Sequence, residues 1–544
     1  MVFVDTALRL RHAYLGGGAW AENVDIGVIG ENIVAVAKSG TLDDSIGPRT
    51  AKIDCGDTYA YPGFVDSHTH TKRSALIGTA FLDCGADAVS SLAEILDRVA
   101  VRSAELPAGA WLQGDNLNPS YIPEGRFPTR YELDAAGGGR PVILRGSGRH
   151  VVSASSSALA AAGIDSGTAD PAGGRIERDS DGEPTGILHE RAKLRLDVTQ
   201  SDTVVPKIPV DVRLHGLRST LQRFHGYGIT TIHEIPRNPD ELGDYLRLRS
   251  AGGLSMRVVF YIRGWEAATR LEYLTGLGLR SDFGDDRLRI GGVKFSIDGS
   301  ASFRNAAVVK QYPDSDDDHG LVRIEEPALT EHIRTAHEAG LRVAVHAIGD
   351  RALDIAIGAF TAAAADIPND PARGPDRVEH AFVAPGRERL DKMARLGVML
   401  SQQPGFIESA SRGYAQIFDD PVLADWLPVA SAIAAGVDVI LNSDHPNAPV
   451  NPFTTLRCAV TRRATDGQIA GLDEAVNIET AFRLMTAAPA RVSGLAGRIG
   501  ALAEGRLADL FVTEQQFFDT PPDELEGTTV LDTFVGGESV HEAH

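Results

Sequence analysis

Eight short apolar segments in the middle of the chain constrain its fold more than any other feature. Helical patterns lie between several of them, and the one at 325–340 ends at Gly340, a common residue at the end of a helix. Eight strand–helix units predict an α/β fold, a (β/α)8 barrel of the TIM type. The predicted strands are residues 61–70, 228–235, 256–264, 288–300, 341–350, 376–383, 397–404 and 436–446.

The two ends of the chain have a different pattern. Short alternating segments fill the first 60 residues and about the last 40, and they predict one small β-sandwich built from both termini. We expect residues 1–60 and 494–544 to form this domain and residues 61–493 to form the barrel. The stretch after the first barrel strand is too long for one helix, so we expect an inserted subdomain at about 80–215. Its own strand signals are residues 141–147 and a hairpin at 175–188.

Composition narrows the possible partners. The 544 residues are 43% hydrophobic, as in soluble globular proteins, and the net charge of −21 argues against binding to nucleic acid or an anionic membrane. The first residues show no basic segment followed by an apolar one, and no apolar run approaches 18 residues, so the pattern predicts neither export nor a membrane span. Its three cysteines are too few for a disulfide framework. We therefore expect a cytoplasmic protein that acts on a small molecule, with a homodimer left open.

His68 and His70 end the first predicted strand, in the sequence YPGFVDSHTH. Alternate side chains of a strand point the same way, so both imidazoles face one side. Functional residues of such barrels lie at the C-terminal ends of the strands. A lone histidine or aspartate there is more often a hydrogen-bonding residue or a helix cap. Six candidates in chain order, however, predict a divalent metal site: His68, His70, Lys294, His346, His380 and Asp444.

This order of residues resembles that of the amidohydrolase superfamily. Longer motifs resemble its amidohydrolase-3, or YtcJ-like, branch, which includes N-substituted formamide deformylases. The motifs extend over nearly the whole chain and are PGFVDSHTH, GEPTG, GGVKFSIDGS, HAIGD, the pair EH at 379–380, QQP, NSDHP and GRLADLFV.

The resemblance implies a role for each candidate ligand. One metal would be held by His68, His70 and Asp444 and a second by His346 and His380, with a carboxylated Lys294 bridging them. One or two zinc ions suit these ligands, and a metal lowers the pKa of water towards about 7. Asp444 would be the general base, taking a proton from water and passing it to the leaving amine. If Lys294 instead pairs with Asp298 or another acid, the site could hold one metal.

Four further residues are candidate substrate contacts. His150 and Arg304 match positions of the branch, and Asn116 and Tyr121 belong to the insertion that the resemblance places over the barrel mouth. The predicted function is metal-dependent hydrolysis of the C–N bond of an amide, formamide or cyclic amide. Two alternatives remain: hydrolysis of an ester, lactone or carbamate at the same site, and a ligand-binding or regulatory barrel without turnover.

Overall fold

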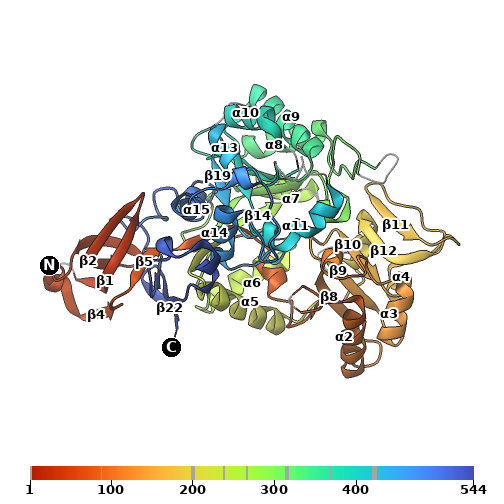
Figure 1. Cartoon of the computed structure of the whole chain (residues 1–544), viewed down its shortest axis with the longest axis horizontal. Coiled ribbons are helices and arrows are strands. Elements are labelled where there is room, and N and C mark those ends of the chain that lie inside the picture. The colour runs from red at the N-terminus through yellow and green to blue at the C-terminus, as the bar shows by residue number, and fades with distance from the viewer. Residues whose placement is uncertain are drawn as a thin grey trace.

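The computed structural model describes residues 3–543 except 87, 198–201, 237–238, 265–267, 313–317, 368–369, 384 and 419–424. The described strands form a central barrel, a sheet that joins both termini, and a sheet within the insertion. Figure 1 shows the terminal sheet and the insertion on opposite sides of the barrel.

The barrel confirms all eight predicted strands. They are parallel and follow the chain order around the sheet, and a bridge between Thr69 and His445 brings the first and last strands together. The barrel is therefore nearly closed. Its strands are β6 (Phe64–Thr69), β13 (Ile229–Glu234), β14 (Arg257–Arg263), β15 (Leu288–Ser296), β16 (Val343–Ala347), β17 (Arg377–His380), β18 (Met399–Gln402) and β19 (Val439–Leu441).

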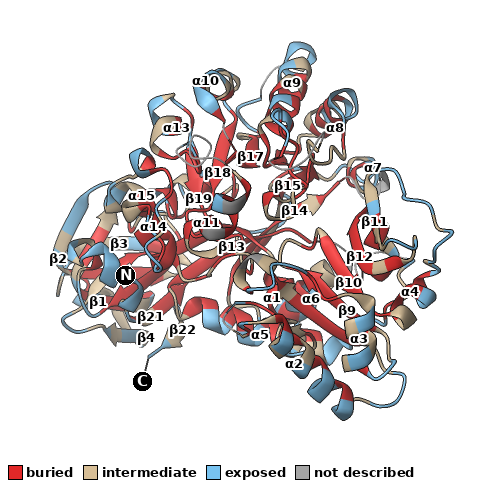
Figure 2. Cartoon of the chain, turned by 45° about the vertical axis from the view of Figure 1, so that its right-hand side comes forward, coloured by how far each residue is buried: buried red, intermediate tan, exposed pale blue. Residues whose placement is uncertain are grey.

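Helices cover the outside of this barrel, and the strands are buried inside them (Figure 2). The predicted helix at 325–340 is α8 (Glu326–Glu338), and Gly340 follows it with a left-handed φ of 72°. Leu329 and Ile333 of α8 are fully buried in the main core, and burying each contributes about 1.5–3 kcal/mol. The other described α-helices outside the insertion are α1 (Thr71–Ser74), α5 (Val210–His225), α6 (Pro239–Ser250), α7 (Ala268–Gly276), α9 (Asp350–Asp366), α10 (Gly386–Leu396), α11 (Phe406–Ile417), α13 (Ala430–Ala434), α14 (Pro452–Thr461) and α15 (Ile478–Leu484).

Among the described helices, none has the length and hydropathy needed to cross a lipid bilayer.

Strands from both termini share one sheet. Its central join is the antiparallel pairing of β5 with β20, and a common core packs Leu8 and Ile26 with Leu510 and Phe534. The domain boundaries and the description as a sandwich stay predictions. The strands are β1 (Val4–Gly16), β2 (Ala19–Ile29), β3 (Asn32–Lys38), β4 (Ile46–Asp54), β5 (Tyr59–Pro62), β20 (Leu510–Thr513), β21 (Val530–Val535) and β22 (Glu538–Glu542).

The described residues of the insertion form their own six-stranded sheet and three α-helices. The predicted hairpin is present as the antiparallel pair β11–β12. Helix α3 begins where the sequence signals it, because Thr129 and Glu132 form a reciprocal capping box. The elements are β7 (Leu82–Asp83), α2 (Leu92–Glu105), β8 (Leu112–Leu117), α3 (Arg130–Gly137), β9 (Val142–Gly146), β10 (Val151–Ala154), α4 (Ser156–Ala162), β11 (Gly174–Arg178) and β12 (Pro184–Glu190).

Candidate metal-dependent active site

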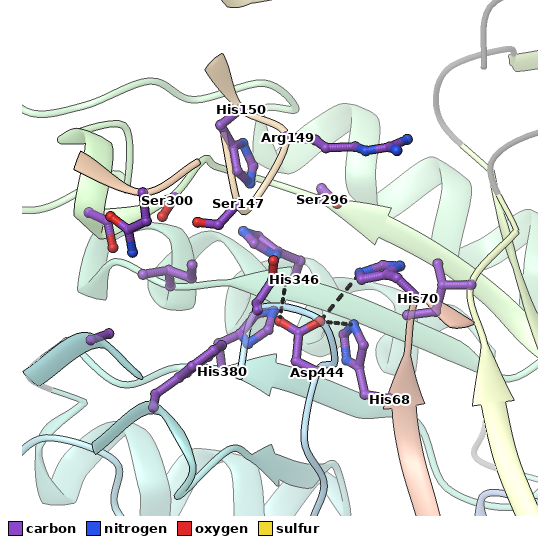
Figure 3. Close-up of a pocket in the computed structure, with 18 of the residues that line it drawn as sticks. His68, His70, Ser147, Arg149, His150, Ser296, Ser300, His346, His380 and Asp444 are labelled. Atoms are coloured by element: carbon purple, nitrogen blue, oxygen red, sulfur yellow. Dashed lines mark hydrogen bonds and ion pairs between the residues drawn. The ribbon is translucent and has the colours of Figure 1, made fainter. Parts of the chain in front are cut away.

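A pocket lies where the C-terminal ends of the barrel strands meet the insertion (Figure 3). All six predicted metal ligands line it, although they come from five different strands or the turns that follow them. The pocket is therefore in the position where barrels of this type carry their active sites.

His68, His70 and Asp444 form the tightest group in this pocket. Oδ1 of Asp444 lies 3.5 Å from Nε2 of His68 and 3.3 Å from Nε2 of His70. One potential ligand atom from each of the three residues lies within 4.8 Å of the others. Two imidazole nitrogens directed at one carboxylate oxygen are a donor set that suits a divalent cation such as zinc.

His346 and His380 lie beside this group. Their ring centroids are 4.6 Å apart, and the ring of His380 is 5.4 Å from that of His68. Lys294, which also lines the pocket, places Nζ 3.6 Å from Oε1 of Glu379. The sequence leaves Asp298 or another acid as a possible partner of Lys294, and the acid that lies 3.6 Å from Nζ is Glu379.

In three of the histidines, one ring nitrogen faces a hydrogen-bond acceptor. Nδ1 of His68 lies 2.9 Å from Glu379, Nδ1 of His380 lies 2.8 Å from the Oε1 atom of Gln403, and Nε2 of His346 lies 3.2 Å from the carbonyl oxygen of Gly299. Each of these nitrogens can donate a hydrogen bond to its acceptor. The other nitrogen of the same ring then keeps a lone pair that can bind a metal. Metal-binding histidines are commonly oriented in this way.

Burial and neighbouring charges together set the protonation states of the candidate ligands. Burial lowers the pKa of His346 and His380 well below the usual value, so both rings are neutral. For Asp444, burial raises the pKa, but His68 and His70 lower it by more. The net effect is a lowered pKa, so the carboxylate is ionised. Burial lowers the pKa of Lys294 to about 8 against the opposing effect of Glu379, and Nζ makes no hydrogen bond to a described residue. These residues fit a divalent metal.

Two of the candidate ligands have a backbone conformation that is rare for residues with a side chain. The φ angle is 77° at His380 and 53° at Asp444. Such left-handed residues cost free energy and gather at functional sites. The conformation turns each side chain into the pocket just as its strand ends, which the residue order alone does not reveal.

The predicted substrate contacts divide into two groups. His150 lines the pocket, in the turn between β9 and β10. Asn116, Tyr121 and Arg304 are not among the described residues that line it, so their contacts with substrate stay predictions. The insertion reaches the pocket through residues that the sequence did not single out: Asn118, Ser147, Gly148, Arg149, Glu190 and Lys193.

Sequence reasoning missed two buried carboxylates. The sequence motifs contain Glu379 only as half of the pair EH and do not contain Glu190. Yet Glu379 lies 2.9 Å from His68, and Glu190 lies 2.8 Å from His150. The adjacency of Glu379 to a candidate ligand was an available signal. Glu190 had no such signal, because 40 residues separate it from its histidine.

Fold and site together define a (β/α)8 barrel protein with a buried histidine- and carboxylate-lined pocket. The family model described as "Amidohydrolase family" matches residues 51–541, and the chain belongs to this family.

Two curated relatives cover almost the whole chain. The chain is 29% identical to an N-substituted formamide deformylase of Arthrobacter pascens, over 94% of this chain and 93% of that protein. It is 28% identical to the putative amidohydrolase YtcJ of Bacillus subtilis, over 91% of each. A solved structure of an uncharacterized metal-dependent hydrolase from Pyrococcus horikoshii superposes with a TM-score of 0.75 at 24% identity, over 95% of this chain and 99% of that one, which supports the fold.

Proposed function

We propose that this protein is a metal-dependent hydrolase that cleaves the C–N bond of an amide, formamide or cyclic amide. The observation that carries the proposal is the convergence of His68, His70 and Asp444, whose ligand atoms lie within 4.8 Å of one another, in one pocket with the other three candidate ligands. The name of the Arthrobacter relative supports a C–N bond as the target.

The chain would hold one or two divalent ions, with zinc expected from its nitrogen and oxygen donors. His68, His70 and Asp444 would bind one ion, and His346 and His380 a second, with Lys294 between them as a carbamate. A metal bound there would supply a Lewis acid and a lowered pKa for water. The buried amine of Lys294, with its pKa lowered to about 8, is neutral often enough to react with carbon dioxide, which would give the carbamate and release a proton.

Asp444 is suited to move a proton. Its carboxylate is ionised and buried, and Oδ2 accepts a hydrogen bond of 3.1 Å from Nδ2 of Asn447. This bond orients the carboxylate towards the pocket. In the proposed reaction Asp444 takes a proton from the attacking water and returns it to the leaving nitrogen, the two halves of general acid–base catalysis.

One wall of the pocket suits a hydrocarbon group of the substrate. Phe382, Phe406, Ala410 and Tyr414 all line the pocket and belong to one apolar cluster. Phe406, Ala410 and Tyr414 lie on helix α11, and the aromatic rings of Phe382 and Phe406 are 5.7 Å apart. Such a wall beside a few polar groups is typical of small-molecule sites. We therefore expect an amide with an apolar substituent.

Metal analysis and turnover test the proposal together. Protein made in zinc-supplemented medium should contain about one to two equivalents of zinc. It should hydrolyse members of a panel of aryl and alkyl amides and formamides, lose that activity on chelation and regain it with zinc. Less than a few tenths of an equivalent of any metal would reject the metal site. A loaded protein that cleaves only esters, or that binds amides without turnover, would favour one of the two alternatives.

A further inference from the structure

The imidazole of His150 enters the pocket from the insertion rather than from the barrel. It lies in the turn between β9 and β10, and Figure 3 shows it over the group that contains His346, His380 and Asp444. Its ring centroid is 5.9 Å from that of His346. A substrate bound at the candidate metal site would therefore lie within reach of this ring.

A buried carboxylate holds one nitrogen of this ring. Oε1 of Glu190 lies 2.8 Å from Nδ1 of His150, and the backbone N–H of Glu190 donates to the carbonyl oxygen of His150 at 2.8 Å. Glu190 is 2% exposed and also accepts a hydrogen bond of 3.2 Å from Asn305. Burial raises the pKa of Glu190, but the hydrogen bond from His150 and the charge of Arg323 lower it to about 2, so this carboxylate is ionised and only accepts. Nδ1 of His150 must therefore carry the proton.

The other nitrogen of the ring can accept a hydrogen bond when the ring carries a single proton. That proton is then the one that Nδ1 shares with Glu190, and Nε2 has none. Within the described part of the chain, no hydrogen-bond partner is present for Nε2. A Cβ atom at Gly148 would come within 2.7 Å of Cδ2 of the ring, so the glycine lets the imidazole lie against this turn.

We infer that His150, positioned by Glu190, is a hydrogen-bond acceptor that selects substrates with an N–H on the scissile C–N bond. The inference rests on the proposed function and narrows its substrate class to primary and secondary amides and formamides. A secondary amide would donate its N–H to Nε2, whereas a bound tertiary amide would cover this half-buried acceptor without pairing it. An acceptor that the bound substrate shields from water and leaves unpaired corresponds to a loss of about tenfold to a hundredfold in kcat/KM.

A pair of substrates that differ by one methyl group tests the selection. The zinc-loaded enzyme should hydrolyse formanilide at least about tenfold faster in kcat/KM than N-methylformanilide. His150→Phe should reduce this ratio towards one while zinc stays bound. His150→Gln, whose amide oxygen can also accept, should keep most of it. His12→Phe, in the terminal sheet, is the matched control and should leave the ratio unchanged.

A spectroscopic measurement tests the same inference without turnover. In ¹⁵N-histidine-labelled zinc-loaded protein, the His150 signals, assigned by their loss in His150→Gln, should show a proton on Nδ1 and none on Nε2. Formanilide should shift the Nε2 signal, and N-methylformanilide should not. For Glu190 as a positioning residue, Glu190→Ala should add the other tautomer to the spectrum and lower the substrate ratio.

The outcomes separate the inference from the proposed function. Equal kcat/KM for the two formanilides, or a proton on Nε2, would overturn the acceptor role and leave C–N hydrolysis standing. The expected Nε2 shift with formanilide, without hydrolysis of any amide, would support the acceptor and reject the proposed hydrolysis.

Discussion

Nδ1 of His68 lies 2.9 Å from Oε2 of Glu379, so a histidine of the first barrel strand and a carboxylate of the sixth meet inside the barrel. The same carboxylate lies 2.8 Å from Nε of Arg377 and 3.6 Å from Nζ of Lys294. Glu379 thus lies next to both His68, a candidate ligand of the first metal, and Lys294, the residue proposed to lie between the two metals. Its negative charge orients His68 and balances the buried guanidinium of Arg377.

Loss of this charge should weaken metal binding. Glu379→Gln keeps the shape of the side chain but removes its charge, so His68 becomes a poorer ligand, and we expect metal affinity to fall about tenfold to a hundredfold. Competition with a chelator, followed by metal analysis, measures this. Glu388→Gln, on the outer helix α10, is the control. Unchanged affinity in Glu379→Gln would show that the carboxylate does not support the site.

Asp444→Asn should abolish turnover and leave the fold intact. The amide has nearly the same shape but cannot take a proton, and general acid–base catalysis typically contributes about 10²–10⁴ in rate. The measurement is kcat on the best amide substrate, with thermal unfolding as the check on folding. The exposed Asp473→Asn serves for comparison. Activity within about tenfold of the unchanged protein would rule out Asp444 as the base.

Lys294 should carry a carbamate. Protein loaded with metal in ¹³C-bicarbonate should give a carbamate carbon signal that disappears in Lys294→Met, and this variant should also lose the second metal. Lys72 is equally buried but donates to Asp244 at 2.7 Å, so Lys72→Met should retain the signal. A plain amine at Lys294 together with one bound metal would contradict the binuclear form.

The apolar wall should determine the size of the substrate. Phe406→Leu shortens a side chain that lines the pocket, so KM for aryl amides should rise about tenfold while kcat changes little. Small aliphatic amides should be less affected. Phe283→Leu, at a position that is 60% exposed, is the matched control. An equal rise in KM for aryl and for small aliphatic amides would mean that the apolar substituent does not bind against Phe406.

Glu234 should make the protein less stable as the pH rises. Burial and the nearby Glu241 raise the pKa of Glu234 from 4.5 to about 8, while the hydroxyl of Tyr245 donates to it at 2.6 Å. The folded protein therefore keeps a proton that the unfolded chain has lost. The contribution of Glu234 to the free energy of unfolding is fully present below pH 4.5. This contribution is lost as the pH rises from 4.5 through about 8.

Glu234→Gln should remove this pH dependence. Urea unfolding of the unchanged protein should show a slope of up to about 1.4 kcal/mol per pH unit in this window, and the variant should show a smaller one. The exposed Glu272→Gln should retain the full slope. Equal slopes in Glu234→Gln and the unchanged protein would mean that Glu234 is ionised in the fold.

The arrangement of the barrel could be predicted because its signals are local. Each parallel strand is a short apolar run, and the strands follow one another around the barrel in chain order, so the pattern alone gave the fold and its end-of-strand residues. His68 and His70 face the same way because they are two residues apart on one strand. The six candidate ligands therefore line one pocket, as their order predicted.

The surroundings of those ligands were decided only by the tertiary structure. Glu379 lies 311 residues from its partner His68, and no periodic pattern links such distant positions. The left-handed backbone at His380 and Asp444 depends on the packing around the strand ends. Which residues of the insertion line the pocket follows from how its sheet docks on the barrel, and they include Glu190 and Arg149, which local spacing does not single out. Local spacing determined the candidate ligands, whereas long-range packing determined how they are oriented and what lies above them.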